Sequence, residues 1–225
     1  RYSNPTGGSI NSEKQKQLVE LARQFDCQII EDDIYGELAL DSSALSVICE
    51  KGPVNTVIKT HDTDDRVMYC SSYSKTVGPG LRIGWCIPGR NKKAVIQAQR
   101  FSTMATSSLP QLTMASYLQN GHYDKHLRSL RQMVTENIKL FSQTVQYNFP
   151  KGTRLSVPAG GFILWICMPE KVSSIELLHR AQAESISIIP GDIFSNSDQF
   201  NHYIRLNCAT PWNEDVKHAI ARLGE

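Results

Sequence analysis

The chain has 225 residues, of which 40% are hydrophobic and 20% are charged, and its formal net charge at pH 7 is +2. This composition is typical of a globular protein with a sizeable core, arranged as one large domain or two smaller ones. The small net charge argues against a surface for non-specific nucleic-acid binding, and the sequence has no apolar stretch as long as a membrane span.

Six cysteines are scattered along the chain, at positions 27, 49, 70, 86, 167 and 208. None stands in a C-x-x-C pair or at a Cys/His spacing used for zinc, so we expect no metal site. Several lie in apolar runs, which is typical of buried free thiols in a reducing compartment. Because no signal peptide is visible either, we expect a cytoplasmic protein without a membrane segment.

The first predicted elements are a turn, a helix and a strand. Residues 4–8, NPTGG, have the composition of a turn, and residues 12–25 carry apolar side chains at helical spacing. Residues 27–30 form a short apolar run that ends in three carboxylates, Glu31, Asp32 and Asp33, with Tyr35 close behind. Open α/β sheets bind their ligands at the carboxyl ends of strands, so these polar residues mark a candidate site.

Residues 41–66 read as a loop-rich connection, and residues 68–87 supply two further strands. The first of these strands ends in three hydroxyls, those of Ser71, Ser72 and Ser74. Lys75 follows, then Gly-Pro-Gly at 78–80, which breaks regular structure, and then Arg82. A lysine near another cation and apolar walls loses part of its preference for the charged form, and a neutral amine forms a Schiff base with a carbonyl.

Serine hydroxyls and a guanidinium suit a phosphate group. An amine beside a phosphate cradle is what pyridoxal phosphate requires. The alternative is a surface turn whose lysine is only solvated.

Helices are expected over residues 92–106 and 110–119, and a long one of about six turns begins near Tyr123. It carries an apolar stripe at three- and four-residue steps, formed by Leu127, Leu130, Val134, Ile138, Phe141 and Val145. Such a stripe is typical of a helix that packs on the core. Beyond residue 150, short strands at 155–157, 162–168, 187–189 and 203–208 alternate with helices near 175–184 and 213–223. We place a domain boundary near Gly121.

Four features now stand in order along the chain: NPTG at 4–7, EDDIY at 31–35, SSYSKTVGPGLR at 71–82 and YIRLNCATP at 203–211. In order and approximate spacing they resemble the fold type I aminotransferases, which depend on pyridoxal phosphate, over essentially the whole chain. The segments EDDIYGEL, CSSYSKTVGPGLRIGWCIPGR, GHYDKHLRSLRQ and GGFILWICMP most resemble the aminotransferase-like domain of MocR-type regulators of the GntR family. The resemblance implies an α/β fold, with residues 1–120 as the second half of the cofactor-binding large domain. Residues 121–225 would then be a bridging helix and a small α+β domain.

By this resemblance, Lys75 holds the cofactor as a Schiff base. Asp32, three residues before the tyrosine, pairs with the pyridine nitrogen and keeps it protonated. Tyr35 and Asn4 hydrogen-bond the phenolic oxygen of the ring. The alternative for Asn4 is that it serves only its turn, and Asp33 is expected to be a surface charge.

The same resemblance assigns the phosphate to Ser72, Ser74 and Arg82. Arg205 would bind the α-carboxylate of a substrate through both nitrogens of its fork. The alternative for Arg205 is an ordinary ion pair.

Two functions share all of these residues. The first is the effector and dimerisation domain of a regulator, which binds an amine or amino acid and acts as a homodimer. Its DNA contacts would lie in an N-terminal winged helix-turn-helix that these residues do not contain. The second is the C-terminal part of a true class I/II aminotransferase of the aminoadipate or kynurenine type, which moves an amino group between an amino acid and a 2-oxo acid.

The chain starts without methionine and inside a turn, so we expect a fragment of a longer protein. The glycine-containing phosphate loop and the ring-stacking aromatic of the family are not among these residues. We therefore expect this fragment to bind pyridoxal phosphate more weakly than a longer form.

Overall fold

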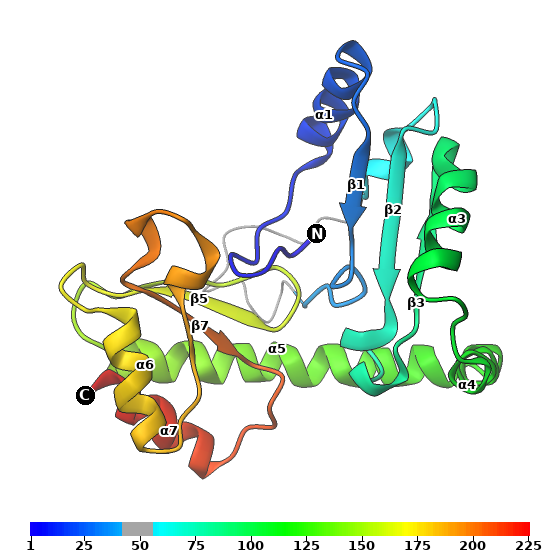
Figure 1. The fold of residues 1–225 in the computed structure, drawn as a ribbon. Coiled ribbons are helices and arrows are strands. Elements are labelled where there is room, and N and C mark those ends of the chain that lie inside the picture. Colours follow the sequence, from blue (N-terminus) through cyan, green and yellow to red (C-terminus); the bar gives the residue numbers. More distant parts are fainter. Residues whose placement is uncertain (42–55) are drawn as a thin grey trace. The chain divides into compact units, whose positions relative to one another are not determined.

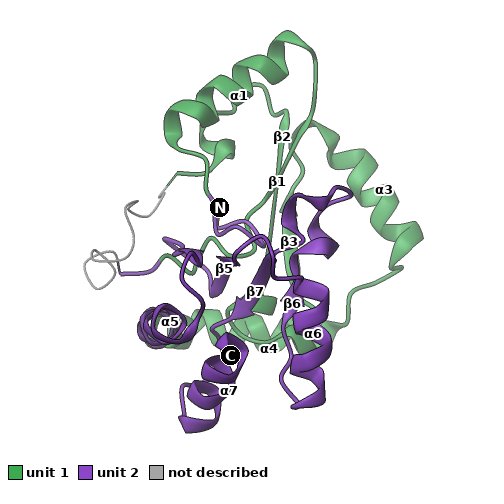
Figure 2. Ribbon diagram, turned by 90° about the vertical axis from the view of Figure 1, so that its left-hand side faces the viewer, with its two compact units in different colours: residues 1, 9–39, 53–130 green, residues 2–8, 40–52, 131–225 purple. Residues whose placement is uncertain are grey.

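The structure of the chain is a computed structural model that describes residues 1–41 and 56–225 (Figure 1). The described residues form two compact units, one with residues 1, 9–39 and 56–130 and one with residues 2–8, 40–41 and 131–225 (Figure 2). The connection expected over residues 41–66 lies partly outside the described residues, and Cys49 lies wholly outside them. The division into domains at residue 120 stays a prediction beside these units.

The first unit is built on a three-stranded sheet in the order β1–β2–β3. Strand β1 (Ile29–Asp32) pairs in parallel with β2 (Val67–Ser72), and β2 pairs antiparallel with β3 (Gly84–Ile87). Helix α1 (Ser12–Gln24) packs at the start of these strands, because its Val19 is buried in one apolar cluster with Val67 of β2, and Ile29 of β1 packs against that cluster. Helices α3 (Lys92–Ser102) and α4 (Ser108–Gln119) follow β3 along the chain (Figure 1).

Strand β1 lies two residues further along than the apolar run 27–30, so Glu31 and Asp32 belong to the strand. Backbone pairing with β2 sets its limits, because Ile29 is opposite Val67 and Asp32 is opposite Cys70. Apolarity alone does not mark the ends of a strand that is buried on only one face.

Short 3-10 helices, η2 (Tyr73–Lys75) and η3 (Pro79–Leu81), form the turn between β2 and β3. The return of the chain into β3 depends on Gly84. A Cβ atom at this position would lie 2.8 Å from the carbonyl oxygen of Ser71, closer than real Cβ contacts. Glycine therefore lets the two strands that enclose the lysine turn approach each other.

The second unit contains a four-stranded antiparallel sheet in the order β4–β5–β7–β6. Its strands are β4 (Arg154–Ser156), β5 (Ile163–Cys167), β6 (Ile189–Pro190) and β7 (Tyr203–Asn207). All five residues of β5 are buried, which makes this strand the centre of the unit's core. Helices α6 (Ser174–Ala183) and α7 (Glu214–Gly224) complete the unit.

Helix α5 (His122–Asn148) begins in the first unit and ends in the second. Its predicted apolar stripe is buried at Leu127, Val134, Ile138, Phe141 and Val145 and partly buried at Leu130. Although it has 27 residues, α5 is too rich in charged and polar residues for a membrane span, and the other described helices are shorter.

Candidate functional site

The carboxyl ends of β1 and β2 meet at one edge of the first sheet because the two strands are parallel. Asp32 is the last residue of β1 and Ser72 the last of β2. The backbone N–H of Asp33 donates to the carbonyl of Cys70 at 2.9 Å, which extends the pairing beyond the strands. The lysine turn therefore starts beside the acidic end of β1, as the sequence predicts.

Neighbouring residues of a strand point to opposite faces of its sheet, and residues opposite each other on paired strands share a face. Asp32, Cys70 and Ser72 thus lie on one face. The Asp32 side chain is exposed there, and its Oδ1 accepts the N–H of Ile34 at 3.1 Å. A free second oxygen on an exposed carboxylate suits a cationic ring N–H.

Lys75 is half-buried at the end of η2, with Nζ 6.0 Å from the centre of the Tyr35 ring. Tyr35 itself is buried. A lysine amine over an aromatic face is held by cation–π attraction and by the apolar wall that the ring provides. The structure thus brings Lys75 and Tyr35 together, whereas a lysine in a simple surface turn would extend into solvent.

The hydroxyls of Ser72 and Ser74 lie 2.9 Å apart. Ser72 caps η2, since its Oγ accepts the N–H of Ser74 at 3.0 Å. This cap fixes two hydroxyls and the start of a helical turn at one place, an arrangement that suits an anion.

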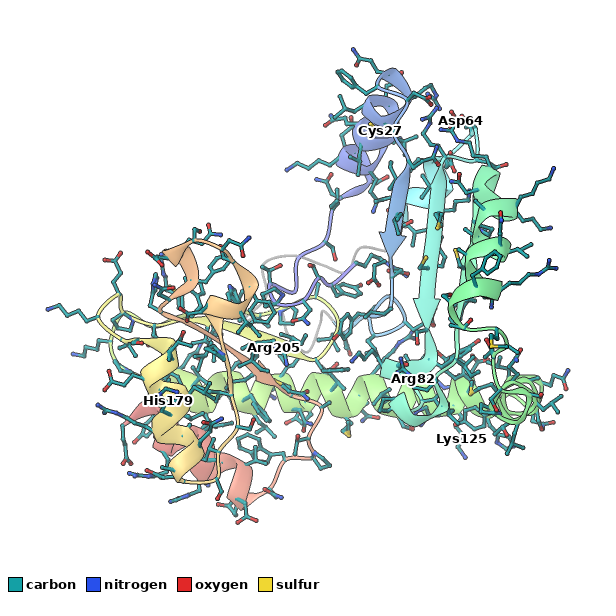
Figure 3. All side chains as sticks on the ribbon, viewed as in Figure 1. Cys27, Asp64, Arg82, Lys125, His179 and Arg205 are labelled. Atoms are coloured by element: carbon teal, nitrogen blue, oxygen red, sulfur yellow. The ribbon has the colours of Figure 1, made fainter. Side chains whose placement is uncertain are left out.

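Arg82 is exposed in the turn between β2 and β3 (Figure 3). Its backbone is left-handed, with φ at 53°, which is uncommon for a residue other than glycine. Its Nη1 makes one long hydrogen bond of 3.4 Å to the carbonyl of Pro79, so most of the guanidinium fork is available to a ligand.

The expectation that Asp33 is a surface charge is wrong. Asp33 is 1% exposed, and its carboxylate receives two hydrogen bonds from Arg1, at 2.9 and 2.6 Å, and one from the Tyr69 hydroxyl at 2.7 Å. Burial by itself raises the pKa of Asp33, but the hydrogen bonds from Arg1 and Tyr69 outweigh it and hold the pKa below its ordinary value. The physical reason is strand alternation, which turns Asp33 to the face opposite Asp32.

The absence of a side chain at Gly36 leaves space for the ion pair between Arg1 and Asp33. A Cβ at Gly36 would collide with the Asp33 carboxylate and with Nη2 of Arg1. Arg1, Tyr69 and Gly36 were not predicted as supporting residues. Alternation along the paired strands places Tyr69, opposite Glu31, on the face of Asp33, whereas nothing in the sequence signals Arg1 or Gly36.

Thr76, directly after the lysine, is fixed by the first turns of α5. Tyr123 donates from its hydroxyl to Oγ1 of Thr76 at 3.2 Å, and Nε2 of His126 lies 2.7 Å from the Thr76 carbonyl. Because a carbonyl only accepts, Nε2 of His126 carries the hydrogen. Tyr123 and His126 were not predicted as supports of the turn, although their spacing of three places both on one helix face.

In the second unit, Nη1 of Arg205 on β7 donates to Oδ1 of Asn4 at 3.1 Å. Nε of Arg205 is buried without a hydrogen-bond partner, and the described residues provide no carboxylate within ion-pair distance of this side chain. A buried guanidinium N–H without a partner is costly, and a bound carboxylate would satisfy it. This fits the predicted carboxylate-binding role better than an internal ion pair.

The predicted residues of the first unit are Asp32, Tyr35, Ser72, Ser74, Lys75 and Arg82, and those of the second are Asn4 and Arg205. Their functional groups are an amine, a carboxylate, two hydroxyls, a phenol and a guanidinium in the first unit, and an amide with a second guanidinium in the second. The groups of the first unit suit an aldehyde, a protonated ring nitrogen and a phosphate, and the guanidinium of the second unit suits a carboxylate. Among the described residues no cluster of His, Cys, Asp and Glu is arranged to hold a metal ion.

Comparison with known proteins gives a consistent result. The aminotransferase class I and II family matches residues 2–223. An uncharacterised HTH-type transcriptional regulator of Escherichia coli, YjiR, is 33% identical over 99% of this chain and 45% of its own length. Aromatic-amino-acid aminotransferase 1 of Thermococcus litoralis is 30% identical over 100% of this chain and 52% of its own length.

Among solved structures, a Pyrococcus horikoshii kynurenine aminotransferase, determined with PMP, superposes with a TM-score of 0.87 at 27% identity. That match covers 99% of this chain and 53% of the other. The predicted α/β fold of this class is therefore confirmed. The chain spans about half the length of the curated relatives it matches.

Proposed function

Because the chain belongs to the aminotransferase class I and II family, we propose that it binds pyridoxal 5′-phosphate in the effector domain of a MocR-type regulator of the GntR family. The observation that carries the regulatory part is similarity along the whole chain to HTH-type transcriptional regulators, at 33% and 34% identity. The capped turn that holds Lys75 beside Tyr35 supports the cofactor.

Pyridoxal phosphate, when bound, supplies an aldehyde that reacts with amines and a ring that withdraws electrons. Lys75, beside the Tyr35 ring, would supply the amine that holds the aldehyde. Asp32 would keep a proton on the ring nitrogen through its exposed carboxylate. Tyr35 and Asn4 are the residues proposed to hydrogen-bond the phenolic oxygen of the ring.

The phosphate is assigned to Ser72, Ser74 and Arg82. The Ser74 hydroxyl and a largely unpaired guanidinium would provide a donor and positive charge, whereas the Ser72 hydroxyl, which donates within the turn, would have to rotate toward the phosphate. Arg205 binds the α-carboxylate of an amino acid effector or substrate, which would pair its orphan Nε.

We include a homodimer and a cytoplasmic location in this proposal. Exposed apolar side chains on and between α3 and α4 support a partner surface: Phe101, Met104, Leu109 and Leu112 are 69–86% exposed. Unpaired cysteines in the described chain support a reducing compartment. DNA contacts are assigned to a winged helix-turn-helix in a longer protein.

The second candidate is a true aminotransferase. The structural likeness to the kynurenine aminotransferase, together with 30% identity to the aromatic-amino-acid aminotransferase, favours it. Both candidates use the same site residues. A winged helix-turn-helix encoded upstream of Arg1 would identify the regulator, and measurable amino transfer to a 2-oxo acid would favour the enzyme.

Covalent trapping tests the cofactor assignment. Borohydride reduction of the protein with pyridoxal phosphate should leave a pyridoxyl group on Lys75, found by peptide mass spectrometry. Lys75→Ala should abolish this adduct and leave the circular dichroism spectrum unchanged, because the half-buried lysine contributes little to packing. An adduct on Lys59 or Lys92 in place of Lys75 would contradict the assignment.

A further inference from the structure

Two cysteines face each other across β2 and β3. Cys70 and Cys86 are directly opposed in the antiparallel register, and their Sγ atoms lie 3.6 Å apart. Both are free thiols and half-buried. In the described part of the chain, no other pair of thiols makes such a contact.

The type of strand pair suits a covalent bond between them. The N–H of Tyr73 donates to the carbonyl of Ile83 at 3.1 Å, which marks a hydrogen-bonded position. Hydrogen-bonded and non-hydrogen-bonded pairs alternate along an antiparallel ladder. Cys70 and Cys86, three positions further, are therefore a non-hydrogen-bonded pair, whose Cα atoms lie about 4.5 Å apart. That separation is within the range of about 4.4–6.8 Å found in disulfides.

The pair also has a defined place beside the candidate site. Cys70 is opposite Asp32 on β1 and two residues before Ser72 on β2, so the thiols share the face of these two residues. Strands β2 and β3 enclose the turn that carries Lys75. A bond between the two sulfurs would tie the two ends of that turn together.

We propose that Cys70 and Cys86 form a reversible oxidation site, a dithiol that small-molecule disulfides convert to an intramolecular disulfide. The inference does not depend on pyridoxal phosphate binding. It requires a rotation of the cysteine side chains that shortens the separation of the sulfurs to about 2.05 Å, with the strands already in register.

The reaction balances as a thiol–disulfide exchange. One cysteine thiolate attacks a sulfur of oxidised glutathione, forms a mixed disulfide and releases one glutathione. The second cysteine thiolate attacks the protein sulfur of that mixed disulfide and releases the second glutathione. The protein loses two electrons and two protons, and oxidised glutathione gains both to become two thiols.

Either cysteine can make the first attack, because both thiols are half-buried. Burial, and after it the neighbouring Cys86 thiol, raises the pKa of the Cys70 thiol. Thiolates are the attacking species, so the exchange is expected to speed up as the pH rises.

The test uses the folded protein, reduced and then incubated with oxidised glutathione, quenched with iodoacetamide and digested with trypsin. The expected product joins peptide 67–75 to peptide 83–90, and dithiothreitol separates them again. Cys70→Ser and Cys86→Ser should each form no link and should each leave the remaining cysteine as a mixed disulfide with glutathione. Cys27→Ser is the matched control, because this exposed thiol is outside the pair and its loss should leave the link unchanged.

Two results with respect to the link would overturn the proposal, and a third concerns mixed disulfides. One is complete alkylation of Cys70 and Cys86 at a glutathione ratio that fully modifies Cys27. The other is a link between the two peptides that forms only in urea, since the native register would then play no part. Independent mixed disulfides on both cysteines, without a link, would equally contradict it.

Discussion

Glu31, Asp32 and Asp33 are chemically alike, yet their positions along β1 give them different surroundings. Glu31 is buried and accepts the N–H groups of Ile58 and Lys59 at 2.7 and 2.9 Å, so it anchors the start of a 3-10 helix (Ile58–His61). Asp33 lies on the same face as Glu31 and is paired with Arg1. Asp32 faces the other way and remains exposed. Strand alternation thus leaves one carboxylate of the three for a ligand.

Asp32→Asn is expected to weaken pyridoxal phosphate binding without a large change in stability. A carboxylate facing a cationic ring nitrogen makes a charge-assisted hydrogen bond worth about 1.5–3 kcal/mol, which corresponds to roughly tenfold or more in affinity. The side chain is exposed, so its replacement removes little packing. Titration of the cofactor by absorbance and urea unfolding measure the two effects. Unchanged affinity would mean that the register of the acidic segment is assigned wrongly.

Asp33→Asn is expected to lower stability and to change pyridoxal phosphate binding little, the reverse of Asp32→Asn. It breaks a buried ion pair, which costs about 3 kcal/mol of unfolding free energy. The pKa of Asp33 is lower in the folded state than in the unfolded one, so the stabilisation is present above the unfolded pKa. It is lost as the pH falls through the folded pKa. The variant should therefore be less stable than the parent at pH 7 and lose less stability on acidification, as urea unfolding at several pH values would reveal. Equal pH dependence in both proteins would contradict this account.

At the scale of elements, the spacing of apolar residues predicts the helices and strands that bury one face in a core. The stripe of α5 and the strands of the second unit follow from apolar spacing, because each element buries one face in a core. Contacts between elements do not follow from it. The hydrogen bonds from Tyr123 and His126 to Thr76 join residues about 50 positions apart, and nothing in their local sequence identifies the partner.

The same limit applies to the candidate site. Motif order predicts which residues take part, whereas the register of β1 against β2 decides which carboxylate faces the ligand. Asn137 is a further example. A polar residue next to the apolar stripe is buried, and its Nδ2 donates to the carbonyls of Cys208 and Thr210, just after the strand that carries Arg205.

Ile138→Ala is expected to destabilise the second unit by about 2–5 kcal/mol, because the side chain is completely buried in the middle of α5. Gln143→Ala, an exposed position on the same helix, should change stability by less than about 0.5 kcal/mol. Chemical unfolding followed by circular dichroism compares the two variants. Similar small effects at both positions would mean that the stripe does not carry the packing of this helix.

At the scale of the whole molecule, charge balance decides which partners the chain attracts. It has 24 Lys and Arg against 22 Asp and Glu. Some basic side chains are paired with carboxylates, as Arg180 is with Glu176 at 2.5 Å and Arg222 with Glu184 at 2.6 Å. Phosphate backbones attract proteins with a large excess of cations that displace counterions, and the near balance of charge gives this chain no such excess.

Residues 1–225 alone are therefore expected to show no DNA binding at about 0.15 M salt, where exposed charges interact over only about 8 Å. If the regulatory proposal is correct, a longer protein in which a winged helix-turn-helix precedes this chain should bind DNA under the same conditions. Its affinity should fall steeply as the salt concentration rises, because each phosphate contact releases counterions. Fluorescence anisotropy with a labelled duplex measures both proteins side by side. Salt-sensitive binding by residues 1–225 themselves would contradict the charge argument, since the DNA surface would then have to lie within the sequence described here.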